Sequence, residues 1–150
     1  MHAGGVRTAV WSGVLATFVA LAAGFWFPAI ALPALDFPAL NGALIVSDEA
    51  SITFLWTVGA VEVFGGGIVM AVLYAFWVQM HLPGPGWFRG VIWGGALAVV
   101  AGLTLFPLLY EGGLFGADWD GRTAVSVILW HLIWGGVLGV AYHKRWTQQP

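Results

Sequence analysis

The amino-acid sequence predicts an all-α, integral-membrane four-helix bundle. Of its 150 residues, 60% are hydrophobic and only 8% are charged, whereas soluble domains carry about 25% charged residues. Four apolar stretches reach the length of about 18 residues at which a helix can span a bilayer. The 22 glycines and 10 tryptophans are typical of membrane helices, where glycine permits close contact and tryptophan favours the interface. This composition excludes a soluble enzyme and a nucleic-acid-binding domain, and the absence of cysteine excludes a disulfide scaffold.

The four predicted spans form a single transmembrane domain and cover residues 7–27, 52–80, 88–109 and 123–143. At a rise of 1.5 Å per residue, each is about 30–43 Å long and can cross the membrane. The first stops at Pro28, and the second stops before the Pro-Gly-Pro-Gly turn at residues 83–86. Prolines interrupt the apolar segment 29–50, so we expect that segment to lie at the outer interface or against the bundle.

The charged residues predict the orientation of these spans. Four bases lie at the two termini and between spans two and three, all on one side: Arg7, Arg89, Lys144 and Arg145. The acids outside the spans lie on the opposite side, where Arg122 is the only base. The positive-inside rule therefore predicts that both termini are cytoplasmic.

An internal repeat relates the two halves of the chain. Residues 23–28 and 101–107 both run from Ala-Gly to Phe-Pro, and an alignment of Glu62 with His131 also aligns Gly66 with Gly135. Two successive hairpins in the same orientation predict a parallel duplication. In that arrangement Glu62 and His131 both lie about 13–15 Å from the outer end of their spans, near the middle of the membrane.

Glu62 is the only acid inside a predicted span. An unpaired charge there costs about 3 kcal/mol, so the side chain should face the bundle with a partner or be protonated. It is either a proton-relay or ion-site carboxylate, or a neutral acid hydrogen-bonded to a neighbouring helix. If it meets His131, the two form an intramembrane polar pair that titrates as a unit.

His131 leaves several roles open. An intramembrane histidine can bind haem or a metal, relay protons, or donate to a backbone carbonyl. Haem b in a bundle normally takes two axial histidines at similar depth, and the other predicted spans offer no second one. We therefore expect no cofactor and no metal.

The glycine clusters predict helix packing rather than phosphate binding. Gly66, Gly135 and Gly139 lie on helical spans, with no strand before them and no Lys-Ser/Thr after them. Gly135 and Gly139 are four residues apart, the spacing of close helix contacts in membranes. Because no Ser-His-Asp set or metalloprotease motif is present, we predict that the protein is not an enzyme.

Three stretches resemble the YagU-like family of small four-helix bacterial inner-membrane proteins: the turn and helix start at 82–91, Phe-Pro-Leu-Leu followed by Gly-Gly-Leu-Phe-Gly within 106–116, and the His-Leu-Ile-Trp-Gly-Gly segment within 131–142. The segment 32–36 is also similar. The resemblance implies four membrane helices in a bacterial inner membrane and no defined reaction. This chain departs from the family at Glu62, where the family usually has histidine, so a Glu–His pair becomes the form to test.

The sequence favours a non-enzymatic accessory or structural subunit that packs in the lipid bilayer against membrane-protein partners or copies of itself. Four short spans enclose little more than their own core. The first alternative is a small proton- or solute-conducting transporter that uses Glu62 and His131. The second alternative is a haem-binding electron-transfer subunit.

Overall fold

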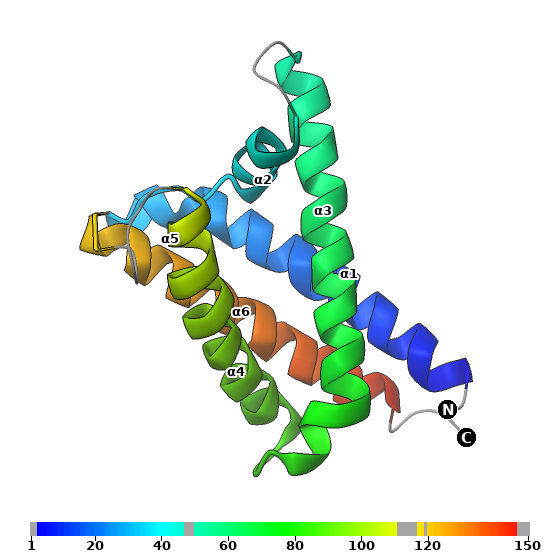
Figure 1. Ribbon diagram of the computed structural model, residues 1–150. Helices are drawn as coiled ribbons and strands as arrows, with labels where there is room; N and C mark the ends of the chain where they lie inside the picture. Colours follow the sequence, from blue (N-terminus) through cyan, green and yellow to red (C-terminus); the bar gives the residue numbers. More distant parts are fainter. Residues whose placement is uncertain (1–2, 47–49, 111–116, 119, 147–150) are drawn as a thin grey trace.

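The computed structural model describes residues 3–46, 50–110, 117–118 and 120–146, which form helices and short connections without any strand. Four stretches are long and apolar enough to cross a membrane: Gly5–Ile30, Ile52–His81, Gly86–Leu109 and Gly121–His143. The prediction of an all-α bundle with four membrane-spanning helices is therefore confirmed (Figure 1).

The first span does not stop at Pro28. α1 (Ala3–Trp26) continues into a 3-10 turn over Phe27–Ile30. Proline is accommodated near the start of a helical turn because the amide that it lacks would have no partner there. The turn ends at Ala31, whose left-handed backbone (φ 60°) lets its N–H reach the Pro28 carbonyl at 3.1 Å.

The apolar segment after the first span contains a short helix that packs on the second span. α2 (Phe37–Ile45) begins at Asp36, whose side chain accepts from the Ala39 N–H at 3.1 Å and from the Trp56 indole N–H at 3.0 Å. Because Asp36 caps one helix and bonds the next, it fixes α2 against α3 (Ile52–Leu73). The structure therefore places this segment against the bundle, one of the two positions expected from the sequence.

Two glycines allow α2 to lie almost in backbone contact with α3. A Cβ added at Gly59 of α3 would lie 1.8 Å from the Pro38 carbonyl oxygen, and one at Gly42 of α2 would lie 2.1 Å from the Leu55 carbonyl oxygen. No other residue type fits these positions without separating the helices. This close approach determines where Asn41, on α2, meets α3.

The second and third spans are helical throughout but change their winding. α3 continues as a π-helical turn over Tyr74–Val78 and a 3-10 turn over Gln79–His81. The third span comprises α4 (Gly86–Leu97), a π-helical stretch over Ala98–Leu105 and the single turn α5 (Phe106–Leu109). Wide turns of this kind re-aim the side chains that follow them.

α6 (Gly121–Trp146) packs along both α1 and α4. α6 contributes Trp134 and Leu138 to the core, and these side chains are 2% and 0% exposed. The Trp134 indole N–H donates to the buried Thr17 hydroxyl of α1 at 3.1 Å. This bond joins the first and last spans near their middles.

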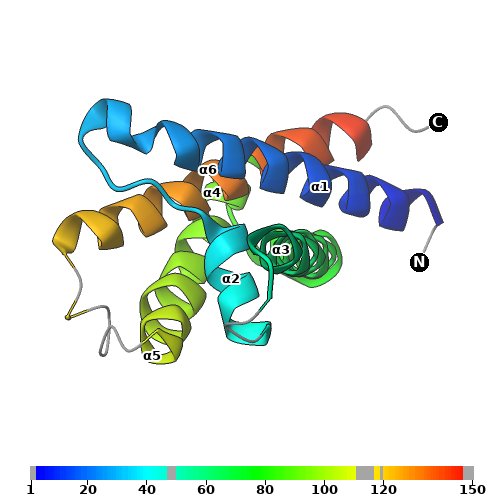
Figure 2. The same cartoon turned by 90° about the horizontal axis from the view of Figure 1, so that it is seen from above.

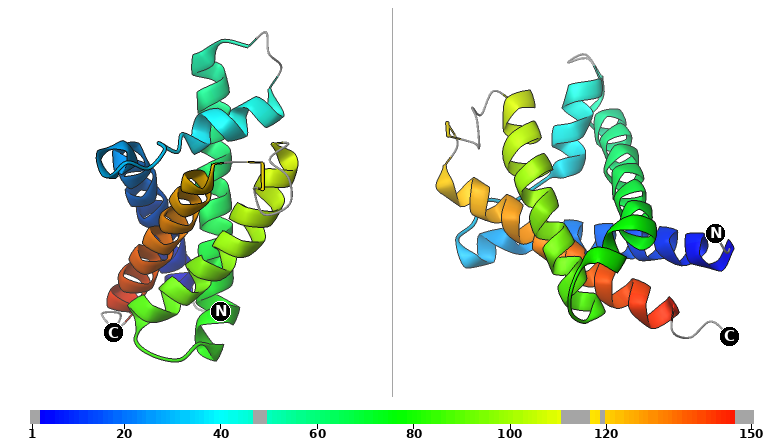
Figure 3. Two further views of the ribbon diagram at one scale, coloured as in Figure 1. Left: turned by 90° about the vertical axis from the view of Figure 1, so that its left-hand side faces the viewer. Right: turned by 60° about the horizontal axis from the view of Figure 1, so that its bottom comes forward.

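The second and third spans meet at their connecting turn and then diverge (Figure 1). Near the turn, the Tyr74 hydroxyl donates to the Gly86 carbonyl and the Trp93 indole donates to the Met70 carbonyl, both at 3.3 Å. Figure 3 shows the chain ends and this turn at one end of the molecule and α2 at the other. We refer to these ends as the terminal side and the α2 side. Seen from the α2 side, α2 lies between α3 and α5 (Figure 2).

Candidate functional site

A cavity of about 170 Å³ lies where α3 and the third span diverge. Residues of α2 line one end of the cavity, and residues of α6 line the wall between α3 and the third span. The lining is mainly aromatic and aliphatic, with three polar side chains. The lining residues are Phe37, Asn41, Glu62, Val63, Gly66, Gly67, Met70, Leu97, Ala101, Phe106, Trp130, His131 and Trp134. Glu62 and His131, which the sequence aligned in its two halves, both line this one cavity.

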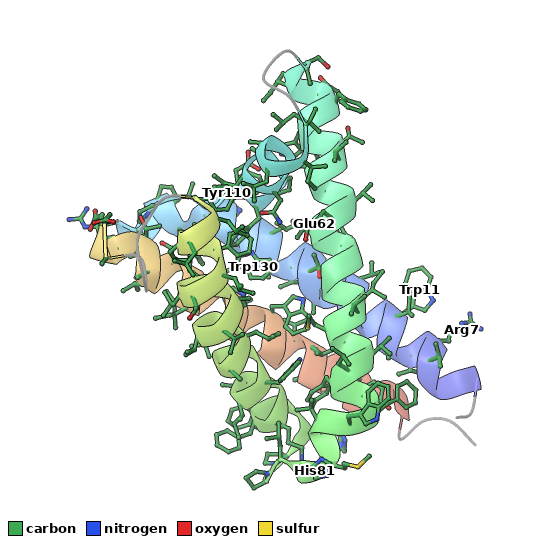
Figure 4. The ribbon with its side chains drawn as sticks, viewed as in Figure 1. Arg7, Trp11, Glu62, His81, Tyr110 and Trp130 are labelled. Atoms are coloured by element: carbon green, nitrogen blue, oxygen red, sulfur yellow. The ribbon has the colours of Figure 1, made fainter. Side chains whose placement is uncertain are left out.

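Glu62 lies on α3 with its side chain in the space between α3 and the third span (Figure 4). The side chain is exposed in the isolated chain, yet it lies well inside the Ile52–His81 span. One carboxylate oxygen, Oε2, accepts a hydrogen bond from the Asn41 side-chain amide. Oε1 has no hydrogen-bond partner among the described residues. The site therefore holds one satisfied and one available carboxylate oxygen.

Asn41 extends the polar cluster to a third element. This side chain is buried, and its carbonyl oxygen accepts from the Tyr110 hydroxyl at 3.1 Å, so Tyr110, Asn41 and Glu62 form a hydrogen-bonded chain. Burial raises the pKa of the Tyr110 phenol above its usual value, and the nearby Glu62 carboxylate raises it further.

Sequence reasoning singled out neither Asn41 nor Tyr110. Asn41 is the only asparagine in the chain, and it interrupts an apolar segment, which is a weak signal for a buried polar contact. Tyr110 directly follows the third span and resembles an ordinary interfacial aromatic residue. The two are 69 residues apart, so only the fold brings them together.

His131 lies on α6 and is 7% exposed. Its Nδ1 is 2.8 Å from the Val127 carbonyl oxygen. Because a carbonyl can only accept, Nδ1 carries the proton of this bond, which leaves Nε2 as the free nitrogen of the neutral ring. No hydrogen bond joins His131 to Glu62 in the described chain, and no group of three metal-ligating side chains converges there.

Aromatic rings form much of the cavity wall. Phe37 packs edge-on against Trp130 at 4.8 Å and against Phe106 at 5.5 Å between ring centroids. Trp134 lies deeper on α6 and is held by its bond to Thr17. Among the described residues, no lysine or arginine lines the cavity. Glu62 is therefore a carboxyl group among aromatic rings, and the described lining gives it no lysine or arginine as a counter-ion.

The three predicted packing glycines have different surroundings. A Cβ added at Gly135 would lie 2.2 Å from the Gly90 carbonyl oxygen, and one at Gly139 would lie 2.2 Å from the Gly86 carbonyl oxygen, so both lie against the backbone of α4. A Cβ at Gly66 would meet only the Glu62 Oε1 atom, at 3.8 Å. Gly66 therefore leaves room in the cavity beside the carboxylate instead of joining two helices.

No protein-family model matches the sequence, and no curated protein or solved structure matches it. The resemblance to the YagU-like family and the internal repeat therefore stay predictions.

Proposed function

We propose that this membrane protein binds a small lipophilic cation in the cavity between α3 and the third span, with Glu62 as the counter-ion, and exchanges that cation for a proton. The proposal develops the conducting-protein alternative from the sequence. It rests on one observation: Glu62 is a carboxylate with a free oxygen in an aromatic membrane cavity whose described lining contains no lysine or arginine.

The charge of the site selects the class of ligand. An isolated carboxylate inside a bilayer is costly, so a proton or a bound cation stabilises it. The rings of Phe37, Phe106, Trp130 and Trp134 line the same space. Aromatic faces attract organic cations by about 0.5–2 kcal/mol each when water is excluded. A proton and an organic cation therefore compete for one carboxylate.

The shape of the site selects the size and route of the ligand. A cavity of about 170 Å³ suits a compact ammonium ion with one ring or a short chain. Because α3 and the third span separate with distance from their connecting turn, the exposed Glu62 side chain faces the space between two membrane helices (Figure 4). Lipophilic molecules can reach such a gap from the bilayer.

Benzyltrimethylammonium is a suitable probe, with neopentylbenzene as its neutral isostere. We expect the purified protein in nanodiscs to bind the cation in a calorimetric titration and to release a proton as it binds. Glu62→Gln should weaken cation binding at least tenfold, or about 1.4 kcal/mol, should abolish proton release, and should leave binding of the isostere unchanged. Equal affinity of the wild type for cation and isostere would overturn the proposal.

Transport requires a second measurement. Protein in liposomes should move protons when the cation is supplied on one side, and both Glu62→Gln and His131→Ala should reduce that flux. His131 is the other titratable group in the cavity lining. Absence of flux in the wild type would leave a binding protein without transport. Flux that is unchanged in both variants would exclude Glu62 and His131 from the transport path.

An accessory or structural role is the second candidate, and one face of α3 favours it. Gly65 has open space where a Cβ would lie, and Val61 and Val69 on the same face are 70% and 54% exposed. Such a face suits a neighbouring helix from a membrane partner or a second copy. Purification in mild detergent should then retain a partner or an oligomer, and a lone monomer would count against this role.

The proposed location is a bacterial inner membrane with both termini in the cytoplasm. Its support is the distribution of bases in the sequence and the resemblance described above. We also propose that the protein is not an enzyme; this is supported by the described lining of the Glu62 cavity, which contains no serine, threonine or cysteine nucleophile.

A further inference from the structure

A second cavity adjoins the Glu62 cavity on the α2 side. It measures about 550 Å³ and is lined in part by Tyr110, Thr123, Asp118 and Asp120. These polar side chains distinguish it from the largely apolar cavity around Glu62. The two cavities share two lining residues, Phe37 and Phe106.

The shared residues form the wall between the cavities. The Phe37 and Phe106 rings meet edge to face, with centroids 5.5 Å apart and an interplanar angle of 70°. Tyr110 stacks on Phe106 at 5.5 Å with an angle of 17°, and its ring lines the second cavity. Its hydroxyl bonds to Asn41, which lines the first. The wall thus has an aromatic plug and a hydrogen bond that crosses it.

One helical turn carries both parts of this wall. Tyr110 directly follows α5 and its N–H donates to the Phe106 carbonyl at 3.0 Å, so the two residues lie one turn apart at the two ends of α5. α5 follows the π-helical stretch Ala98–Leu105, and its second residue, Pro107, has no N–H to bond to that stretch. Tyr110 hydrogen-bonds to the Asn41 side chain, which also bonds to Glu62, so two hydrogen bonds connect the end of α5 to the carboxylate.

We propose that the second cavity is the aqueous entrance to the Glu62 cavity, and that α5 is the gate between them through Phe106 and Tyr110. The inference rests on the proposed function, for which it supplies the route from water. When Glu62 is neutralised by a proton or a cation, the Asn41 amide loses a charged acceptor. The hydrogen bond from Asn41 to Glu62 then weakens. The bond from the Tyr110 hydroxyl to Asn41 is the remaining contact that holds α5 in the closed position.

The absence of cysteine from the chain permits a direct test. A cysteine in place of Ala101 would line the Glu62 cavity, and a permanently charged methanethiosulfonate reagent can reach it only through water. The matched control is Thr123→Cys, which lines the entrance itself. Both cysteines are placed in full-length protein in sided vesicles, with the rest of the chain intact or carrying Tyr110→Phe.

We expect Ala101→Cys to react slowly from the α2 side and at least ten times faster when Tyr110→Phe removes the hydroxyl that bonds to Asn41. Phe106→Ala should have the same effect by removing the plug. Thr123→Cys should react at one rate in all three backgrounds, which checks that each variant is folded. From the terminal side, the Ala101→Cys rate should be low and unchanged.

Equal Ala101→Cys rates with and without the gate substitutions would overturn the proposal, as would faster reaction from the terminal side. The labelling rate does not require Glu62 to bind a cation. A protein that fails to bind benzyltrimethylammonium but shows gated labelling refutes the proposed function alone. A protein that binds the cation but shows ungated labelling refutes the gate alone.

Discussion

The contact between α2 and α3 should govern both stability and the position of Asn41, and Gly59→Ala tests it. The added Cβ would lie 1.8 Å from the Pro38 carbonyl oxygen and 2.6 Å from the Gly42 nitrogen. The helices must separate by about 1.6 Å before the first of these reaches the 3.4 Å of an ordinary contact. Both obstructing atoms belong to the backbone, so a change of side-chain rotamer cannot relieve the clash.

The matched control is Gly65→Ala on the same helix, where an added Cβ meets nothing within 4 Å. Alanine favours a helix over glycine by about 1 kcal/mol at either site, so this contribution cancels in the comparison. Overpacking costs about 1–3 kcal/mol. We therefore expect Gly59→Ala to be less stable than Gly65→Ala by about 1–3 kcal/mol, with a further loss if Asn41 is drawn away from Glu62.

The free energy of unfolding of the two variants can be compared by reversible denaturation with sodium dodecyl sulfate in mixed micelles. Cation binding supplies a second readout, because a displaced Asn41 no longer holds Glu62 in place. Equal stability within about 0.5 kcal/mol, the range of ordinary surface substitutions, would refute the packing of α2 on α3.

Three further predictions concern single contacts. Asp36→Ala should lower the free energy of unfolding by about 1–2 kcal/mol, because α2 loses its cap, whereas Asp36→Asn should retain most of it; equal losses would contradict the cap. In a double-mutant cycle, Trp134→Phe and Thr17→Val should couple by about 0.6–1.7 kcal/mol, and strict additivity would exclude that bond. With the other two tyrosines replaced by phenylalanine, ultraviolet titration should show that the pKa of Tyr110 is above its usual value, chiefly because the phenol is buried. Glu62→Gln should lower that pKa, since it removes the negative charge that opposes phenolate formation. An unchanged titration midpoint would show that Glu62 and Tyr110 do not interact electrostatically.

The sequence predicted the class of the protein because that class depends on sums over many residues. Low charge and four long apolar stretches require helices in a bilayer, whatever their mutual packing. Glu62 also stood out without a structure, since a charge at that depth in a span is costly wherever the helix faces. The hydrogen-bond partner of Glu62 could not be predicted in the same way. The position of a residue along a helix gives its depth in the membrane but not the direction in which its side chain points.

The cavity was determined by tertiary structure alone. Asn41 is 21 residues from Glu62, and Tyr110 is 69 residues from Asn41. Their meeting depends on the backbone contact that Gly59 allows and on the divergence of α3 from the third span. The sequence paired Glu62 with His131 by alignment; the fold brought both to one cavity but gave Asn41 the hydrogen bond to the carboxylate. Composition and hydrophobic length are local properties that a chain carries unfolded, whereas a hydrogen bond between distant side chains exists only after packing has set the distance between their helices.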